Sequence, residues 1–176
     1  STRTVLYEIF KCLTAWLAPV ICYTAEEAWL AHNGTDNEDS IHMKQFPEIP
    51  EEWLDNNLNQ KWTVIRKIRR IVNGALELAR QDKIIGSSLE AEIKLYINNN
   101  EYLSLTNEIN IEEIAIVSKS HVLEGYNIEG SYKEDGLQGI EIVVSKAKGH
   151  KCARCWKIDE NIMDGPLCDR CNKVVK

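Results

Sequence analysis

The amino-acid sequence predicts a mainly α-helical bundle, then a small mixed α/β unit, and a C-terminal module built on four cysteines. Three observations carry this prediction. Apolar residues recur at three- and four-residue steps in the first half of the chain, they alternate with polar residues after Gly86, and two Cys-x-x-Cys pairs stand near the C-terminus. The first spacing is that of an amphipathic helix, and the second is that of a half-buried strand.

The N-terminal segment predicts two helices. Apolar residues from Thr4 to Leu17 follow the helical period, and Pro19 ends this first helix. Thr24, followed three residues later by Glu27, has the pattern of a capping box that opens a second helix. We expect the second helix to stop near Gly34, since glycine favours helix C-termini.

A long helix is expected after a connecting loop. Residues 34–50 are rich in turn-forming residues, and one apolar stripe then predicts a helix over about 51–82, with Gly74 as its weak point. Basic residues project beside this stripe, and both a solvated face and a phosphate-contacting face are open for them. They are Arg66, Arg69, Arg70 and Arg80.

The pattern after Gly86 predicts a small mixed unit. A strand is expected around 93–97, a short helix around 100–108, and further strands at 114–117 and 140–144. We therefore expect three domains with these bounds: 1–86 for the helical domain, 87–148 for the α/β unit and 149–176 for the cysteine module.

Four of the six cysteines form the two pairs: Cys152, Cys155, Cys168 and Cys171. The surrounding segment has too few large apolar side chains for a core that could offset its ordering entropy. Four thiolates suit one tetrahedral Zn²⁺, which predicts a zinc-finger module, whereas a redox dithiol would need only one pair. A closed set of four protein ligands leaves no position for water, so the ion is expected to be structural, and we predict no catalytic residue.

The charge distribution of the chain indicates a class of binding partner, and its cysteines indicate a cellular compartment. The chain has a net charge of −6, yet residues 146–176 hold eight Lys and Arg against four Asp and Glu. A basic island of this kind suits contact with a polyanion, although a solvated surface is the commoner explanation. The sequence shows no signal peptide and no membrane span, so we expect a cytoplasmic protein whose cysteines stay reduced.

Basic and aromatic residues surround the four predicted ligands. Trp156 could stack on an unpaired base or cover the metal site, and the covering role is favoured. The hypothesis is that the exposed turns touch RNA phosphates. The residues concerned are Lys151, Arg154, Trp156, Lys157 and Arg170.

Several segments together resemble the C-terminal part of the bacterial isoleucyl-tRNA synthetases, which belong to class I. The resemblance follows the same order along most of the chain and is weak only over 98–139. The segments are "LAPVICYTAEEAWL" (17–30), "DSIHMKQFPEIP" (39–50), "WTVIRKIRRIVNGALELARQDKIIGSSLEAEI" (62–93), "GHKCARCWKI" (149–158) and "PLCDRC" (166–171).

This resemblance implies an anticodon-binding helical domain, here partial, and a zinc module that together hold the anticodon arm of isoleucine tRNA. It implies a monomer whose other partner is the remainder of an ATP-dependent isoleucine-tRNA ligase. The sequence contains no HIGH-like or KMSKS-like signature, so the chain looks like a fragment that should not aminoacylate tRNA alone. The four cysteines, Arg154 and Trp156 match motif positions, and the arginines of the long helix match only as basic positions.

Two other readings stay open. A similar four-cysteine zinc hairpin ends certain bacterial DNA glycosylases, which would make this a DNA-binding module. The zinc unit could also be an intramolecular scaffold that folds back on the helical domain without touching RNA. Comparing the binding of tRNA and of duplex DNA at equal salt distinguishes a DNA-binding module from an RNA-binding one. Mapping cross-links to tRNA distinguishes an intramolecular scaffold from a module that contacts RNA.

Overall fold

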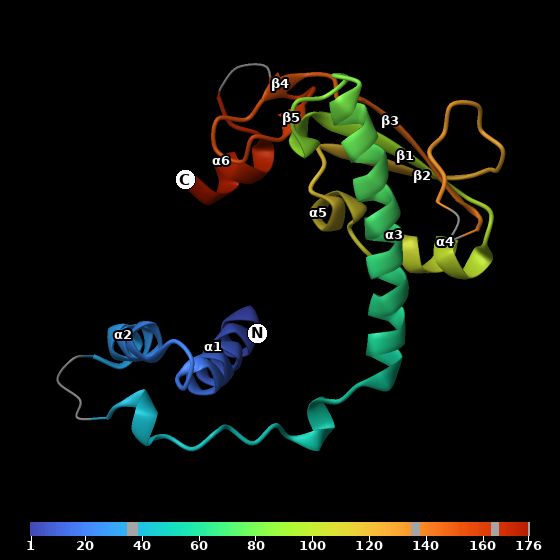
Figure 1. Ribbon diagram of the computed structural model, residues 1–176. Coiled ribbons are helices and arrows are strands. Elements are labelled where there is room, and N and C mark those ends of the chain that lie inside the picture. The colour runs from blue at the N-terminus through green and yellow to red at the C-terminus, as the bar shows by residue number, and fades with distance from the viewer. Residues whose placement is uncertain (35–38, 135–137, 163–165, 176) are drawn as a thin grey trace. The chain divides into compact units, whose positions relative to one another are not determined.

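The computed structural model (Figure 1) describes residues 1–34, 39–134, 138–162 and 166–175. Its contacts gather into two compact units, Ser1–Asp55 and Asn56–Lys176, called here the first and the second unit. The expected fold class is confirmed, because helices form the N-terminal portion, a small mixed sheet follows, and four cysteines meet near the C-terminus. In the described part of the chain, no helix is long and apolar enough to cross a membrane.

The first unit is a pair of helices with a short segment folded against them. α1 (Thr2–Leu17) and α2 (Cys22–Asn33) pack together through small residues, and the 3-10 helix η1 (Ile41–Met43) joins the same buried cluster. The indole N–H of Trp29 donates to the carbonyl oxygen of Asp39 (2.7 Å). This hydrogen bond fixes the start of the segment on α2.

The predicted capping box of Thr24 and Glu27 is wrong. α2 begins three residues earlier than this box requires, and Ile21, which has no capping oxygen, occupies the N-cap position in place of Thr24. The chain leaves α1 through a tight turn in which the carbonyl of Leu17 accepts the amide of Ile21 (2.9 Å), so the next helix starts almost at once. The predicted end of α2 near Gly34 is confirmed, because Gly34 follows the helix with a φ of 91°.

The long predicted helix is α3 (Asn56–Gln81), which starts later than the expected bound of 51. Glu51–Trp53 instead form a separate 3-10 turn, η2. Gly74, the expected weak point, has a packing role, since the hydroxyl of Tyr132 lies so close that a larger side chain would collide with it. The first apolar residues of the predicted stripe, Leu54, Leu58 and Trp62, are exposed. The buried ones are Ile65, Ile68, Ile71, Val72, Ala75, Leu76 and Ala79.

The three-stranded sheet has the order β2-β1-β3. Its central strand β1 (Ala91–Ile97) pairs in parallel with β2 (Lys119–Glu124) and antiparallel with β3 (Ile140–Lys146). The predicted alternation in β1 is confirmed, because every second residue is buried in one hydrophobic cluster with α3. The short helix expected at 100–108 is also confirmed as α4 (Asn100–Asn107).

The predicted strand at 114–117 is wrong. These residues end the helix α5 (Ile111–Ala115) and form the turn after it, where Ile116 has a φ of 57°. The side-chain oxygen of Asn110 accepts the amide of Glu113 (3.1 Å) and caps this helix. A short apolar run does not by itself distinguish a buried helix from a strand, and here the capping residue decides for the helix.

Glu141 in β3 is a buried charge that holds the chain segment after β2. Its carboxylate accepts the amides of Asn127 and Ile128 (2.8 Å each), the hydroxyl of Ser131 (2.7 Å) and the ammonium of Lys133 (2.9 Å). Burial alone would raise the pKa of Glu141, but these hydrogen bonds lower it from 4.5 to about 2. The carboxylate is therefore ionised at neutral pH.

The contacts place α3 with the sheet, because its buried stripe and the inner face of β1 share one core. The boundary between compact units accordingly follows Asp55. The division into domains at 1–86, 87–148 and 149–176 stays a prediction.

Candidate metal centre and basic surfaces

Residues 149–162 and 166–175 form a small hairpin and a helix, called here the cysteine hairpin. β4 (His150–Lys151) pairs antiparallel with β5 (Ile158–Asp159), and α6 (Asp169–Val175) follows. The first Cys-x-x-Cys pair lies in the turn between the two strands, and the second spans the start of α6. Together they bring four sulfur atoms to one place: those of Cys152, Cys155, Cys168 and Cys171.

The spacing of the sulfur atoms fits one tetrahedral metal ion. All four lie within 4.8 Å of one another, and the Sγ atoms of Cys155 and Cys168 are 3.7 Å apart. Zinc–sulfur bonds of about 2.3 Å at tetrahedral angles place sulfurs about 3.8 Å apart. Two donors also point at sulfur: the amide of Cys168 at Sγ of Cys152 (3.3 Å), and the guanidinium of Arg154 at Sγ of Cys171 (3.8 Å). Such N–H groups orient metal-bound thiolates and reduce their charge.

The pKa values of the thiols also favour the binding of a cation at this site. Burial raises the pKa of Cys152, but hydrogen bonds with the backbone of Cys155, Cys168 and Arg154 outweigh this effect and lower it to about 6. Burial and, to a smaller extent, the neighbouring thiols raise the pKa of Cys155 to about 12, although a hydrogen bond with the backbone of Lys157 lowers it. Thiolates packed this closely repel one another, and a divalent ion supplies the charge that lets all four lose their protons.

A half-buried serine joins the cysteine hairpin to the sheet. The hydroxyl of Ser118 accepts the amide of Ile158 (2.7 Å) and donates to the carbonyl of Leu89 (2.5 Å), beside the 3-10 helix η3 (Ser88–Glu90). Gly149, at the hairpin's start, has a φ of 116° and packs directly on the backbone of Asp159. Sequence reasoning missed both residues, because their partners are distant along the chain.

The predicted polar residues of the cysteine hairpin lie on its surface. Trp156 is 59% exposed and has a φ of 66°, and the ammonium of Lys151 stands 5.2 Å from its ring centroid. The covering role favoured for Trp156 finds no support in this packing, since Ile162 and Leu167 are the apolar side chains that pack with the cysteines among the described residues. Arg154 and Lys157 flank Trp156 on the same turn, and Arg170 lies 3.5 Å from Glu113.

The four arginines of α3 do not form one uniform free face. Arg80 forms an ion pair with Glu77 and donates to the hydroxyl of Ser88 (2.7 Å), and Arg70 pairs with Glu134 (2.7 Å). Arg66 makes a long contact with the side-chain oxygen of Asn59, at 3.5 Å, and Arg69 is exposed. Arg66 and Arg69 are therefore the α3 arginines best placed to bind an anion.

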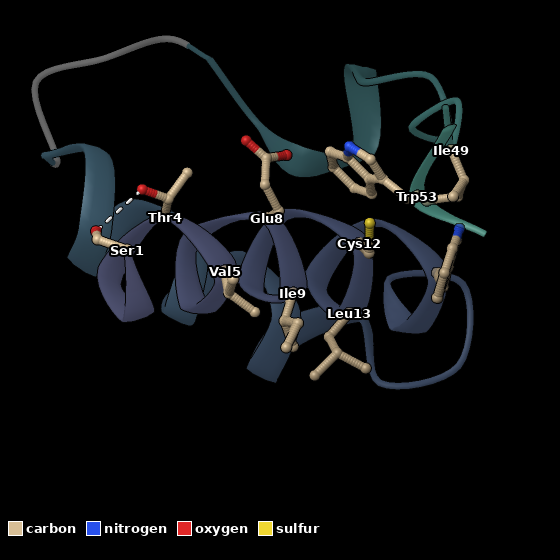
Figure 2. Close-up of a pocket in the computed structure, with 10 residues that line it drawn as sticks. Ser1, Thr4, Val5, Glu8, Ile9, Cys12, Leu13, Ile49 and Trp53 are labelled. Carbon is tan, nitrogen blue, oxygen red and sulfur yellow. Dashed lines mark hydrogen bonds between the residues drawn. The ribbon is translucent and has the colours of Figure 1, made fainter. Parts of the chain in front are cut away.

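The first unit carries an apolar groove of about 610 Å³ (Figure 2). One side is the outer face of α1, and the other is formed by Ile49 and Trp53. The periodicity of α1 predicted a buried face, yet many of its large apolar side chains are exposed in this unit, with Val5 at 58% and Leu13 at 48%.

Known proteins match both the helical and the cysteine-bearing parts of the chain. The isoleucine-tRNA ligase of Mesorhizobium japonicum is 39% identical over 165 residues, which cover 92% of this chain and 16% of that protein. That of Gluconobacter oxydans is 41% identical over 179 residues, 99% of this chain and 18% of that protein. That of Brucella suis biovar 1 is 42% identical over 159 residues, 90% and 16% respectively. The chain thus spans about a sixth of the length of these relatives.

A family match agrees with these relatives. Residues 1–95 match the family described as the anticodon-binding domain of tRNA ligase. This match includes the first unit, α3 and most of β1. The chain therefore belongs to the family of anticodon-binding domains of tRNA ligases.

Proposed function

We propose that this chain binds the anticodon arm of isoleucine tRNA as part of an isoleucine-tRNA ligase. The observation that carries the proposal is the combination of the family match over 1–95 with a basic cysteine hairpin in the same chain. The ATP-dependent attachment of isoleucine belongs to the longer ligase, in the cytoplasm. The chain alone is expected to bind tRNA as a monomer without aminoacylating it.

The ion held by the four cysteines is proposed to be zinc. Soft thiolate donors and a tetrahedral arrangement select Zn²⁺ over hard, oxygen-seeking cations. Four sulfur ligands leave no position open for a substrate, so the ion's contribution is structural. It orders the turn that carries Arg154, Trp156 and Lys157 and the helix start that carries Arg170.

The residues of this turn are proposed to contact the RNA in two ways. Lys151, Arg154, Lys157 and Arg170 neutralise phosphates, and this term makes binding salt-dependent. The exposed ring of Trp156 offers a stacking platform for an unpaired base, and the exposure of this ring favours stacking over a covering role. Arg154 has a second role, since its guanidinium also donates to the sulfur of Cys171.

A charge reversal at Lys151, whose ammonium stands over the Trp156 ring, gives the sharpest test. Lys151→Glu should weaken tRNA binding and reduce the slope of log K against log salt by about 1, because one phosphate contact is lost. Lys94→Glu, an exposed lysine in β1, makes the same charge change outside the proposed surface and is the matched control. Equal losses in both variants would indicate only a nonspecific charge effect. Zinc content is measured in each protein, so that loss of metal is not mistaken for loss of contact.

The stacking contact has its own test. Trp156→Leu removes the platform while keeping apolar bulk, and should cost about 1–3 kcal/mol of tRNA binding free energy. An unchanged affinity would contradict the stacking role.

Stronger binding of duplex DNA than of tRNA at equal salt would favour a DNA-binding module. Cross-links to tRNA found only before residue 86 would favour a scaffold role for the cysteine hairpin.

The arginines of α3 are proposed as a second, weaker contact. Arg66 and Arg69 have the more available guanidinium groups, whereas Arg70 and Arg80 would first have to leave carboxylate partners. Exposed ion pairs contribute little, so this exchange is inexpensive. All four remain proposed RNA contacts.

The apolar groove of the first unit is proposed to pack against the remainder of the ligase. Such a contact would bury the exposed apolar side chains of α1 and remove them from water. In the full-length ligase, Leu13→Asp should lower thermal stability more than Leu6→Asp, the same substitution at an exposed leucine of α1 that does not line the groove. Equal effects would contradict the groove's role.

A further inference from the structure

A cavity of about 320 Å³ lies between the cysteine hairpin and the sheet and gives access to two of the four sulfur ligands. Cys155 and Cys168 line it. Most of its other lining side chains are charged, which suits water and small polar molecules rather than an apolar ligand. The charged ones include Lys119, Lys148, Lys157, Arg170, Asp159 and Glu160.

The other two ligands are shielded. Cys152 is fully buried and Cys171 is 2% exposed, and neither is among the described residues that line the cavity. Both of their sulfur atoms already accept N–H donors, from the amide of Cys168 and the guanidinium of Arg154. Hydrogen bonds to a metal-bound thiolate reduce its nucleophilic character. Cys155, in contrast, is the only one of the four that is not classed as buried.

We propose that Cys155 and Cys168 form a peroxide-sensitive pair, whose oxidation to a disulfide releases the metal ion from the cysteine hairpin. Their sulfur atoms, 3.7 Å apart, are close enough for the second to react with the oxidised first. Forming the bond shortens this separation to about 2.05 Å. This inference rests on the proposed zinc site and goes beyond the proposed tRNA contact.

The chemistry balances with hydrogen peroxide as the oxidant. The Cys155 sulfur attacks one peroxide oxygen, the O–O bond breaks, and a sulfenic acid forms while the other oxygen leaves as hydroxide and takes up a proton to become water. The Cys168 sulfur then attacks the Cys155 sulfur, the S–S bond forms, and the second hydroxide leaves and is protonated. The two sulfurs together lose two electrons, which the peroxide gains.

Loss of two ligands leaves the ion with Cys152 and Cys171 alone. Two thiolates hold zinc far less tightly than four, so the ion dissociates. The cysteine hairpin then loses the order that the ion supplied, because few apolar side chains are buried there among the described residues. A dithiol reductant with zinc reverses the change.

The test uses the zinc-loaded chain. Hydrogen peroxide is added with a chromogenic zinc chelator, and disulfides are mapped by mass spectrometry after thiol trapping. Cys155→His removes the attacking thiol but keeps a Cys3His ligand set, and should slow zinc release about tenfold or more. Cys171→His changes a shielded ligand in the same way but keeps the reactive pair, so its peroxide-dependent rate of zinc release, after subtraction of release to the chelator alone, should exceed that of Cys155→His about tenfold or more.

A dominant disulfide between Cys155 and Cys168 in the wild-type chain supports the proposal, even if a histidine variant fails to hold zinc. A dominant disulfide between any other two cysteines, or equal rates in the two variants, overturns it. The zinc content before oxidation tests the metal assignment separately. A chain that carries no zinc contradicts that assignment, and the disulfide map still decides which thiols react.

Discussion

The helix-and-sheet core of the second unit and its cysteine hairpin are stabilised in different ways. α3 and β1 bury branched apolar side chains almost completely, among them Ile71, Ile93 and Leu95 at 0% exposure. Among the described residues of the hairpin, the buried cluster consists of three cysteines and Ile162. The first region folds by removing apolar surface from water, whereas the second is proposed to depend on an ion that four thiolates share. Conditions that affect one region should therefore leave the other largely intact.

Removing the metal should have the largest effect. Chelation is expected to unfold the cysteine hairpin, because a structural zinc contributes on the order of 10 kcal/mol of apparent folding free energy. Hydrogen exchange should then show loss of amide protection in β4, β5 and α6, with protection in β1 retained. Zinc addition should restore it. Continued amide protection of the hairpin without any metal would contradict a metal-dependent fold for this region.

A substitution that creates a cavity in the apolar core should destabilise the helix-and-sheet region. Ile93→Ala should lower the free energy of unfolding of the second unit by about 2–5 kcal/mol, because the side chain is fully buried. Urea denaturation followed by circular dichroism measures this loss. Lys94→Ala changes the exposed neighbour and should stay within about 0.5 kcal/mol of wild type. A large fall in zinc affinity for Ile93→Ala would show that the two regions are coupled.

A backbone change at the junction tests how the hairpin is joined to the sheet. Gly149→Ala should cost about 1–3 kcal/mol, since φ is positive and the new Cβ meets the backbone of Asp159. Competition with a chelator should report this cost as weaker zinc binding. Gly130→Ala is the matched control, because its φ of 74° is also positive but nothing lies within 4 Å of the added carbon. An equal loss of zinc affinity in both variants would exclude the steric explanation.

The smallest effect should come from the buried carboxylate of Glu141. Its folded pKa of about 2 lies below the ordinary 4.5, so its contribution to stability is complete above pH 4.5 and is lost as the pH falls toward 2. Glu141→Gln should be less stable than wild type by about 1–2 kcal/mol at neutral pH, since charge-assisted hydrogen bonds are lost. Unfolding measured from pH 7 to pH 3 should show this gap closing in acid. A constant gap would contradict the assignment.

Local patterns were enough to predict the elements that carry their own periodicity. The alternation in β1 and the stripe of α3 from Ile65 onward were read correctly, because each depends on residues within one segment. The run at 114–117 was misread, since its form depends on a cap by Asn110 rather than on its apolar residues. The start of α2 was misread for a similar reason, because the turn after α1, and not Thr24, sets where it begins.

The sequence alone determined the four-cysteine site, because ligand type and spacing specify the donor set without knowledge of the fold. Only the tertiary structure decided which thiols face a cavity, why Ser118 and Gly149 matter, and that α3 packs on the sheet. These features are contacts between residues far apart in the chain. Their energies arise only when folding brings both partners together, so no local pattern records them.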